Sequence, residues 1–509
     1  MRVFICLTWL TFLTNVQSVP AWYKSPREAI LATERRQSIG AMLTLTSEEE
    51  AVNKIIMAAK QTEINSAIYD HSNFIPAVHF FQGRHLMEQS KVFKIIQQMP
   101  KGAALHLHYG SITSSDWLVK NVTYRPDCYV CVKQKVITQT GFYVTPPSDK
   151  DCKWLRISAE RAKSKDITEF DQWLYNNLTL TVDNPEVAYP NINVIWRRFK
   201  QYFKTVHGLL NNAPVMKDAL YETLREFHVD GVQYLEIRIG LIRPYEVNGT
   251  THDPTWFVET FRDVVNQFKQ DYPDFSGAKL ILAGRKVNRA SAILQDVKVV
   301  TDLVKRFPDV ILGYDLVQQE DVTHTLLYYI SDLLYPESHS SNLPYFFHAG
   351  ETDWLDIHDN NLIDAILLNT SRIGHGFAIP KHPEVMRLIK ERNIPIEVNP
   401  ISNQVLKLVS DLRNHPAAIL ISQDFPVCIS SDDPAPWEAL PLSHDFYMAF
   451  MALAASDDDL RFLKQLAINS MNFSGMTSQE KASALRLWET KWNSFLKHVL
   501  RSHTTPIVG

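Results

Sequence analysis

Two histidines at the end of one apolar run suit metal chemistry. His106 and His108 close the run Gly102–His108 and stand two residues apart. Alternate residues of a β-strand point to the same face, so the two imidazoles face the same way. A single strand histidine is usually a core residue held by hydrogen bonds, whereas two at this spacing are also compatible with metal ligands.

The same residue types follow three further apolar runs. His348 and Glu351 stand three residues apart, His375 lies between two glycines, and Asp432 and Asp433 follow a pair of serines. Ionised side chains are rarely buried without partners, so packing alone does not explain this recurrence. Together these residues indicate one metal-dependent hydrolytic site.

The ligand types indicate both the metal and the reaction. Three imidazoles with one carboxylate suit zinc or another borderline divalent ion. An open coordination position would hold a water with its pKa lowered toward about 7, and a carboxylic acid and a further histidine would transfer protons. A serine hydrolase is the alternative, but the chain has no G-x-S-x-G motif at a strand-to-helix turn.

Eight short apolar runs must position these side chains. Helical patterns separate most of them, which predicts right-handed βαβ units and a parallel sheet. Eight units favour an α/β fold of the (β/α)8 TIM-barrel type, whose active sites lie at the carboxyl ends of the strands. An open doubly wound sheet is the rival, but no G-x-G-x-x-G or P-loop motif occurs. The runs are Gly102–His108, Val232–Ile239, Ala278–Gly284, Val310–Val317, Leu343–Gly350, Arg372–Gly376, Ile394–Pro400 and Pro426–Pro434.

A helical region precedes the barrel, and an insertion interrupts it after the first strand. Ser47 and Glu50 have capping-box spacing at the start of one helix. The helical region either mediates oligomerisation or packs as a layer on the barrel. The predicted boundaries are 19–100 for this region, 101–116 and 178–500 for the barrel, and 117–177 for the inserted subdomain.

The insertion carries a cluster of cysteines. Cys128 and Cys131 form a C-x-x-C, and Cys152 follows. A zinc ribbon would need a second C-x-x-C, which is missing. A disulfide from this pair to Cys152 is therefore expected in an oxidising compartment.

The first residues predict export. Residues 1–18 combine Arg2, an apolar core of about 11 residues and small residues before a cleavage point, which is typical of a signal peptide. This core is shorter than the roughly 20 residues that span a membrane, so we expect a secreted, extracellular protein without a membrane span. Five N-x-S/T sequons are then candidate glycosylation sites, at Asn121, Asn177, Asn248, Asn369 and Asn472.

Composition excludes several classes of protein. The chain has 509 residues, with 52 Lys and Arg against 56 Asp and Glu, which gives a formal charge of −4. This balance predicts no nucleic-acid groove. With 45% hydrophobic and 21% charged residues, the chain is not disordered as a whole.

Four motifs together resemble one enzyme family. MPKGAALHLH, FFHAGET, RIGHG and ISSDDPA are similar to the adenosine deaminases, in their secreted branch, the adenosine deaminase-related growth factors. The resemblance implies hydrolysis of adenosine and 2′-deoxyadenosine to inosine and 2′-deoxyinosine with release of ammonia. It implies one zinc ion per subunit, bound by His106, His108, His348 and Asp432.

The resemblance also implies roles around the purine. Glu351 would donate a proton to N1, His375 would orient the attacking water and assist its deprotonation, and Asp433 would contact N7. Trp196 matches a tryptophan that lines the nucleoside pocket, with a plain core residue as the alternative. The family further implies a homodimer through the N-terminal helices, a Cys131–Cys152 disulfide, growth-factor activity, and receptor or glycosaminoglycan contacts by the insertion.

Two substrate-binding positions depart from the family. Tyr109 stands where the secreted branch has an aspartate that holds the ribose 5′-hydroxyl, and Gln318 stands where it has a glycine whose N–H meets purine N3. The residues that the resemblance assigns to the metal and to proton transfer are all present, but two of those assigned to substrate binding differ. The alternatives are therefore a deaminase-like protein with another substrate, or a growth-factor or receptor-binding protein with little catalysis.

Other polar residues are expected to be structural. Glu236 and Arg238, in the segment YLEIR, are predicted to form a structural ion pair at the barrel. His382 and His415 each precede a proline in a predicted loop and are expected to face solvent.

Overall fold

The structure is a computed structural model that describes residues 20–148, 150 and 152–504. The predicted signal peptide, residues 1–18, lies outside the described residues. Within them, no helix is both long enough and apolar enough to cross a membrane.

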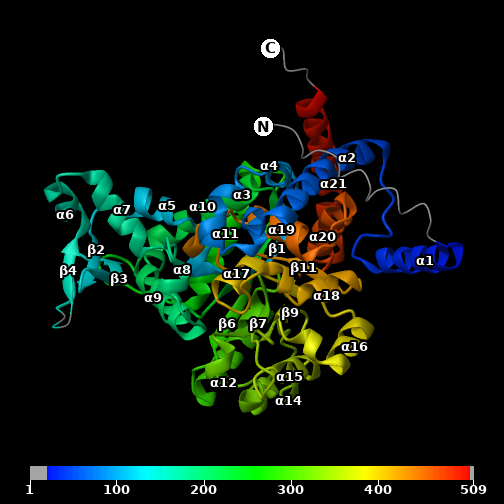
Figure 1. Ribbon diagram of the computed structural model, residues 1–509. Helices are drawn as coiled ribbons and strands as arrows, with labels where there is room; N and C mark the ends of the chain where they lie inside the picture. The colour runs from blue at the N-terminus through cyan, green and yellow to red at the C-terminus, as the bar shows by residue number, and fades with distance from the viewer. Residues whose placement is uncertain (1–19, 149, 151, 505–509) are drawn as a thin grey trace, which may run out of the picture.

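Eight parallel strands close into a barrel at the centre of the molecule (Figure 1). One four-stranded sheet has the order β1-β5-β6-β7 and the other has the order β11-β10-β9-β8. Parallel bridges from Tyr314 to Tyr345 and from Leu107 to Asp432 join the two sheets. The barrel prediction is thus confirmed over the open sheet. The strands are β1 (Gly102–His108), β5 (Val232–Ile239), β6 (Gly277–Arg285), β7 (Ile311–Val317), β8 (His348–Ala349), β9 (Ile373–His375), β10 (Ile396–Val398) and β11 (Val427–Ile429).

Helices cover the barrel because their apolar faces pack against the strands. Three long ones follow the first strands of the barrel in turn, with their buried residues at helical spacing. The helices from the one before the second barrel strand onward are α10 (Ala213–Val229), α11 (Pro254–Asp271), α12 (Ala290–Arg306), α13 (Ile330–Leu333), α14 (Tyr335–Ser338), α15 (Asn361–Leu367), α16 (Pro383–Arg392), α17 (Pro400–Val405), α18 (Ala417–Ser422), α19 (Ser443–Met448), α20 (Leu460–Asn472) and α21 (Ser478–Thr504).

The N-terminal helices α1 (Ala21–Gln37), α2 (Ser47–Tyr69), α3 (Phe80–Met87) and α4 (Lys91–Gln98) precede the barrel. The capping box of α2 is formed by Thr46 and Glu49, not by Ser47 and Glu50. Ser47 is already the first residue of the helix, so the residue before it, Thr46, is the cap. The buried Lys60 of α2 donates hydrogen bonds to the carbonyls of Ala455 and Asp458. This part of the extension therefore packs as a layer on the barrel.

The insertion forms a small antiparallel sheet of order β3-β2-β4, from Val136–Phe142, Cys128–Lys133 and Lys153–Arg156. A disulfide joins Cys131 to Cys152, with 5.6 Å between their Cα atoms, and Cys128 is a buried free thiol. In Figure 1 this sheet lies at the left and α1 at the right, on either side of the barrel. The helices near it are α5 (Ser115–Trp117), α6 (Ile157–Lys163), α7 (Ile167–Asn177), α8 (Pro185–Ala188) and α9 (Ile192–Leu210).

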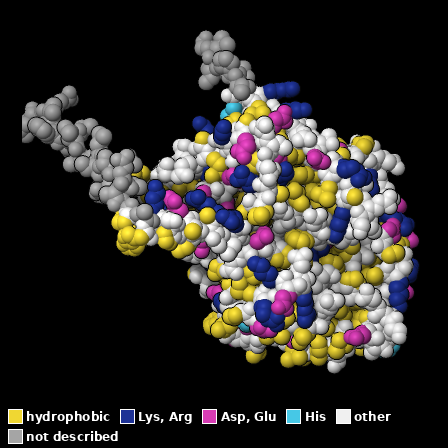
Figure 2. All heavy atoms as spheres, turned by 90° about the vertical axis from the view of Figure 1, so that its right-hand side faces the viewer, with side chains coloured by type: hydrophobic (Ala, Val, Ile, Leu, Met, Phe, Trp, Pro, Cys, Tyr) yellow, Lys and Arg dark blue, Asp and Glu magenta, His cyan; other side chains and the backbone are white. Residues whose placement is uncertain are grey.

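Helix α9 connects the insertion to the barrel. A Cβ atom at Gly208 would lie 1.7 Å from the carbonyl oxygen of Thr140, so only glycine allows α9 to approach β3 this closely. On the side of the molecule shown in Figure 2, basic and acidic side chains are interspersed, so that side presents no single-sign surface.

Candidate active site

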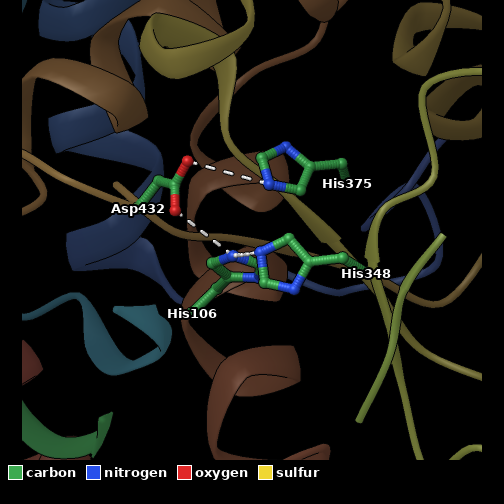
Figure 3. Close-up of side chains that lie close together, drawn as sticks. All are labelled: His106, His348, His375 and Asp432. Carbon is green, nitrogen blue, oxygen red and sulfur yellow. Dashed lines mark hydrogen bonds and ion pairs between the residues drawn. The ribbon is translucent and has the colours of Figure 1, made fainter. Parts of the chain in front are cut away.

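Strand ends bring three histidines and one aspartate together (Figure 3). His106 lies near the end of β1, His348 begins β8, His375 ends β9 and Asp432 follows β11. One donor atom from each lies within 4.8 Å of all the others. All four side chains are buried. His108 completes the group, with its Nε2 at 3.1 Å from Oδ1 of Asp432.

Two carboxylates orient the histidines from behind. Nδ1 of His106 lies 2.6 Å from Glu397, and Nδ1 of His348 lies 2.7 Å from Asp315. Burial acts to raise the pKa of Asp315, but His348 and Arg238 hold it well below its usual value. Each carboxylate accepts the Nδ1 proton, so each Nε2 presents a lone pair to the centre of the cluster. Metal-binding histidines characteristically have such outer partners.

The donor set fits a divalent cation. Nε2 of His106 lies 3.0 Å from Nε2 of His348 and 3.3 Å from Oδ1 of Asp432. That oxygen is buried and has no hydrogen-bond partner among the described residues. Two facing lone pairs and one carboxylate oxygen without a hydrogen bond suit a cation bound between them.

Backbone strain accompanies the cluster. His375 has φ of +61° and Asp432 has φ of +59°. Both lie in the left-handed region, which side chains other than glycine enter at a cost, and such conformations concentrate at functional sites.

A buried ionic network lies beneath the cluster. The predicted Glu236–Arg238 ion pair is wrong, because each of the two residues has other partners. Arg238 bonds instead to Asp315 at 2.7 Å and to Glu397 at 2.6 Å. Glu236 pairs with Arg372, whose Nε also reaches Glu397 at 2.6 Å. Glu236 and Arg238 both point into the barrel, where they meet partners from other strands.

An acid and a histidine face each other beside the cluster. Oε1 of Glu351 lies 3.7 Å from Nε2 of His375, which lies 3.7 Å from Oδ2 of Asp432. Burial, together with Asp432 and Glu320, raises the pKa of Glu351 well above its usual value. The raised pKa favours the protonated carboxylic acid form of Glu351, the form that can donate a proton.

A hydrogen-bonded chain fixes the tautomer of His375. The backbone N–H of Ala417 donates to Nδ1 of His415, so the ring proton of His415 lies on Nε2, which donates to Oδ1 of Asn403 at 2.9 Å. Nδ2 of Asn403 then donates to Nδ1 of His375 at 3.1 Å. Burial keeps the pKa of His375 well below its usual value, so the neutral ring carries its proton on Nε2.

The expectation that His415 faces solvent is thus wrong, because this side chain is only 2% exposed. His382 is half-buried and pairs with Asp359 at 3.0 Å.

The hydrogen-bonded chain through Asn403 also indicates which histidines can be metal ligands, since a protonated Nε2 on His375 cannot bind a metal. It favours His108 as the third imidazole of the cluster.

The residues expected to bind substrate line one cavity of about 660 Å³ together with Glu351 and His375. They are Tyr109, Trp196, Gln318 and Asp433. Burial, and then the neighbouring Asp432, raises the pKa of Asp433, and Ser111 donates a hydrogen bond to its Oδ1. The hydroxyl of Tyr109 donates to the carbonyl of Leu210 at 2.9 Å.

Gln318 occupies an unusual backbone position. Its φ is +138°, a region that glycine adopts readily and other residues rarely do. The glycine that the family resemblance implies here would be unstrained.

The sequons lie away from the cavity. Asn121, Asn248, Asn369 and Asn472 are exposed. Asn177 is half-buried, accepting a hydrogen bond from the N–H of Ile137 and donating one to Trp173.

The fold and site define a barrel hydrolase with a candidate metal centre. A family model described as adenosine deaminase matches residues 177–488, and one described as adenosine/AMP deaminase N-terminal matches residues 3–96. Adenosine deaminase 2 of Homo sapiens is 44% identical over 476 residues, which cover 93% of each chain. Adenosine deaminase 2-A of Danio rerio is 45% identical over 475 residues, 92% of this chain and 93% of that one.

Among solved structures, an adenine deaminase from Arthrobacter aurescens has a TM-score of 0.54 at 18% identity and covers 78% of this chain and 99% of its own. This likeness supports the fold alone. The extensive sequence matches go further: the chain belongs to the adenosine deaminase family. Its enzyme class is that of hydrolases acting on a cyclic amidine C–N bond.

Proposed function

We propose that the protein is a secreted, zinc-dependent purine nucleoside deaminase that converts adenosine and 2′-deoxyadenosine to inosine and 2′-deoxyinosine plus ammonia. One observation carries the proposal: Glu351, whose pKa is raised, faces His375 beside a buried cluster of histidines and an aspartate that line one cavity. Deamination at C6 needs an acid for N1 and an oriented water at that place.

His106, His108, His348 and Asp432 would hold the zinc ion. Bound there, it would supply Lewis acidity, which lowers the pKa of water toward about 7. The outer carboxylates Glu397 and Asp315 would keep two of the imidazoles in the correct tautomer.

The protein's own groups then act on substrate and water. Glu351 protonates N1, which makes C6 more electrophilic. His375 orients the attacking water by donating from Nε2, as the Asn403 contact supports. This refines the role expected from the family, because a protonated Nε2 does not accept a proton. Asp433, with its raised pKa, donates to N7.

A direct assay tests the proposal. The purified protein is analysed for bound zinc, and ultraviolet absorbance is followed on addition of adenosine, deoxyadenosine and other aminopurines. Zinc at about one per chain with turnover of adenosine is expected. Zinc without turnover of any aminopurine would overturn it.

Secretion and assembly form a second part of the proposal. Cleavage after Ser18, glycans on the exposed sequons and a homodimer built through the N-terminal helices belong to it, as does a receptor- or glycosaminoglycan-binding role, with growth-factor activity, for residues 117–177. The mass and N-terminus of protein collected from culture medium test secretion, and light scattering tests the dimer. An uncleaved, intracellular monomer would contradict this part.

A further inference from the structure

Four basic side chains line the mouth of the catalytic cavity. Lys200, Lys204 and His207 stand at positions i, i+4 and i+7 of α9 and share the helix face that borders the cavity. Arg285, the last residue of β6, borders the same cavity from the barrel. All four are exposed to solvent.

The three cations among them, Lys200, Lys204 and Arg285, are not neutralised locally. Across residues 20–148, 150 and 152–504, no carboxylate forms an ion pair with Lys200, Lys204 or Arg285. The carboxylates that line the cavity are Glu351, Asp432 and Asp433, and these are only 2–6% exposed, beside the histidines. The cavity therefore has its acidic groups inside and unpaired positive charge at its entrance, an arrangement that attracts anions.

The orientation of a nucleoside puts its 5′ end at this entrance. C6 of the purine must reach Glu351 and His375, and the ribose is attached at the other end of the base. A 5′ substituent then points away from the cluster and toward the basic residues.

Tyr109, at the position where the family binds the ribose, is compatible with a phosphate on the 5′ end. An aspartate there would repel a 5′-phosphate, whereas Tyr109 is uncharged and its hydroxyl is already bonded to Leu210. We propose that this enzyme accepts purine nucleoside 5′-monophosphates, with the phosphate bound by Lys200, Lys204 and Arg285. Lysine and arginine are the usual phosphate-binding side chains. The inference rests on the proposed deaminase function and names its substrate class.

The experiment compares AMP with adenosine. The ratio of kcat/KM for AMP to that for adenosine is measured at low and high salt, for the wild type and for Lys204→Ala/Arg285→Ala. Arg197→Ala is the matched control, because Arg197 is an exposed cation of the same helix that does not line the cavity. Binding of IMP and of inosine is measured in parallel by calorimetry.

We expect the ratio to fall about tenfold or more in the double variant and to fall with salt, while Arg197→Ala leaves it unchanged. IMP should bind more tightly than inosine, and the double variant should remove that advantage. Adenosine turnover without AMP turnover, or equal binding of IMP and inosine, would overturn the inference but leave the deaminase function standing. If no aminopurine is turned over, the proposed function fails, and calorimetry still decides the phosphate site.

Discussion

Asn403 donates a hydrogen bond from Nδ2 to Nδ1 of His375 across 3.1 Å, and its own orientation is fixed by His415. The direction of this chain originates in a backbone N–H, that of Ala417, which cannot act as an acceptor. The tautomer of His375 is therefore set by residues that do not line the cavity.

Asn403→Asp should reverse this hydrogen bond. A carboxylate would accept a proton from Nδ1 of His375, leaving Nε2 without the hydrogen that orients the water. We expect kcat to fall about 100-fold or more, as for other losses of a positioned proton donor. Steady-state kinetics provides the measurement, with zinc content and the melting temperature as controls.

His415→Gln is the matched variant, because a glutamine amide can still donate to Asn403. It should keep kcat within about tenfold of the wild type. If both variants lose activity equally, or if Asn403→Asp keeps full activity, the tautomer does not control the reaction.

Glu351→Gln should abolish turnover while leaving the metal bound. The substitution removes the proton donor but keeps the side chain's size, and Glu351 is not one of the proposed ligands. A loss of about 100-fold or more in kcat is expected. Metal analysis of the same preparation is decisive, since loss of zinc would contradict the assignment of Glu351 as an acid.

Asp315→Asn should weaken metal binding without touching a ligand. Asp315 accepts from Nδ1 of His348 at 2.7 Å and also pairs with Arg238. Loss of such an outer partner typically costs about 10–100-fold in metal affinity. Competition with a chelator of known affinity measures the effect, and an unchanged zinc affinity in a folded variant would argue against a metal at His348.

Gln318→Gly should relieve the strain of a φ of +138°. We expect the free energy of unfolding to rise by about 1 kcal/mol and KM for adenosine to fall, because the side chain also leaves the cavity. Gln318→Ala is the control, since it removes most of the side chain but keeps the strain. Chemical denaturation and kinetics separate the two effects; a less stable Gln318→Gly would disprove the strain.

The barrel and the inner cluster could be predicted because each strand, and the polar residue at or after its end, forms one continuous segment of sequence. A parallel strand buried on both faces is a continuous apolar run, and residues such as His106 and Asp432 stand directly at or after those runs. Chain order therefore brings them to the same end of the barrel.

The outer shell could not be predicted in this way. Glu397 lies in a short apolar strand and bonds to His106, 291 positions away in sequence. His415 precedes a proline in a polar stretch that is typical of a surface loop, yet it is buried against Asn403. Pairings of this kind depend on which strands face each other across the barrel, and no local spacing encodes that. One signal was present: Glu397 is a carboxylate inside an apolar run.

Metal removal and restoration test the account most directly. The purified protein is dialysed against a chelator, assayed with adenosine by ultraviolet absorbance, and assayed again after titration with zinc. We expect activity to disappear with the metal and to return in proportion to zinc, reaching a plateau at about one equivalent per chain. Adenosine turnover that persists in metal-free protein would contradict the central claim, as would a zinc-loaded protein that deaminates no aminopurine.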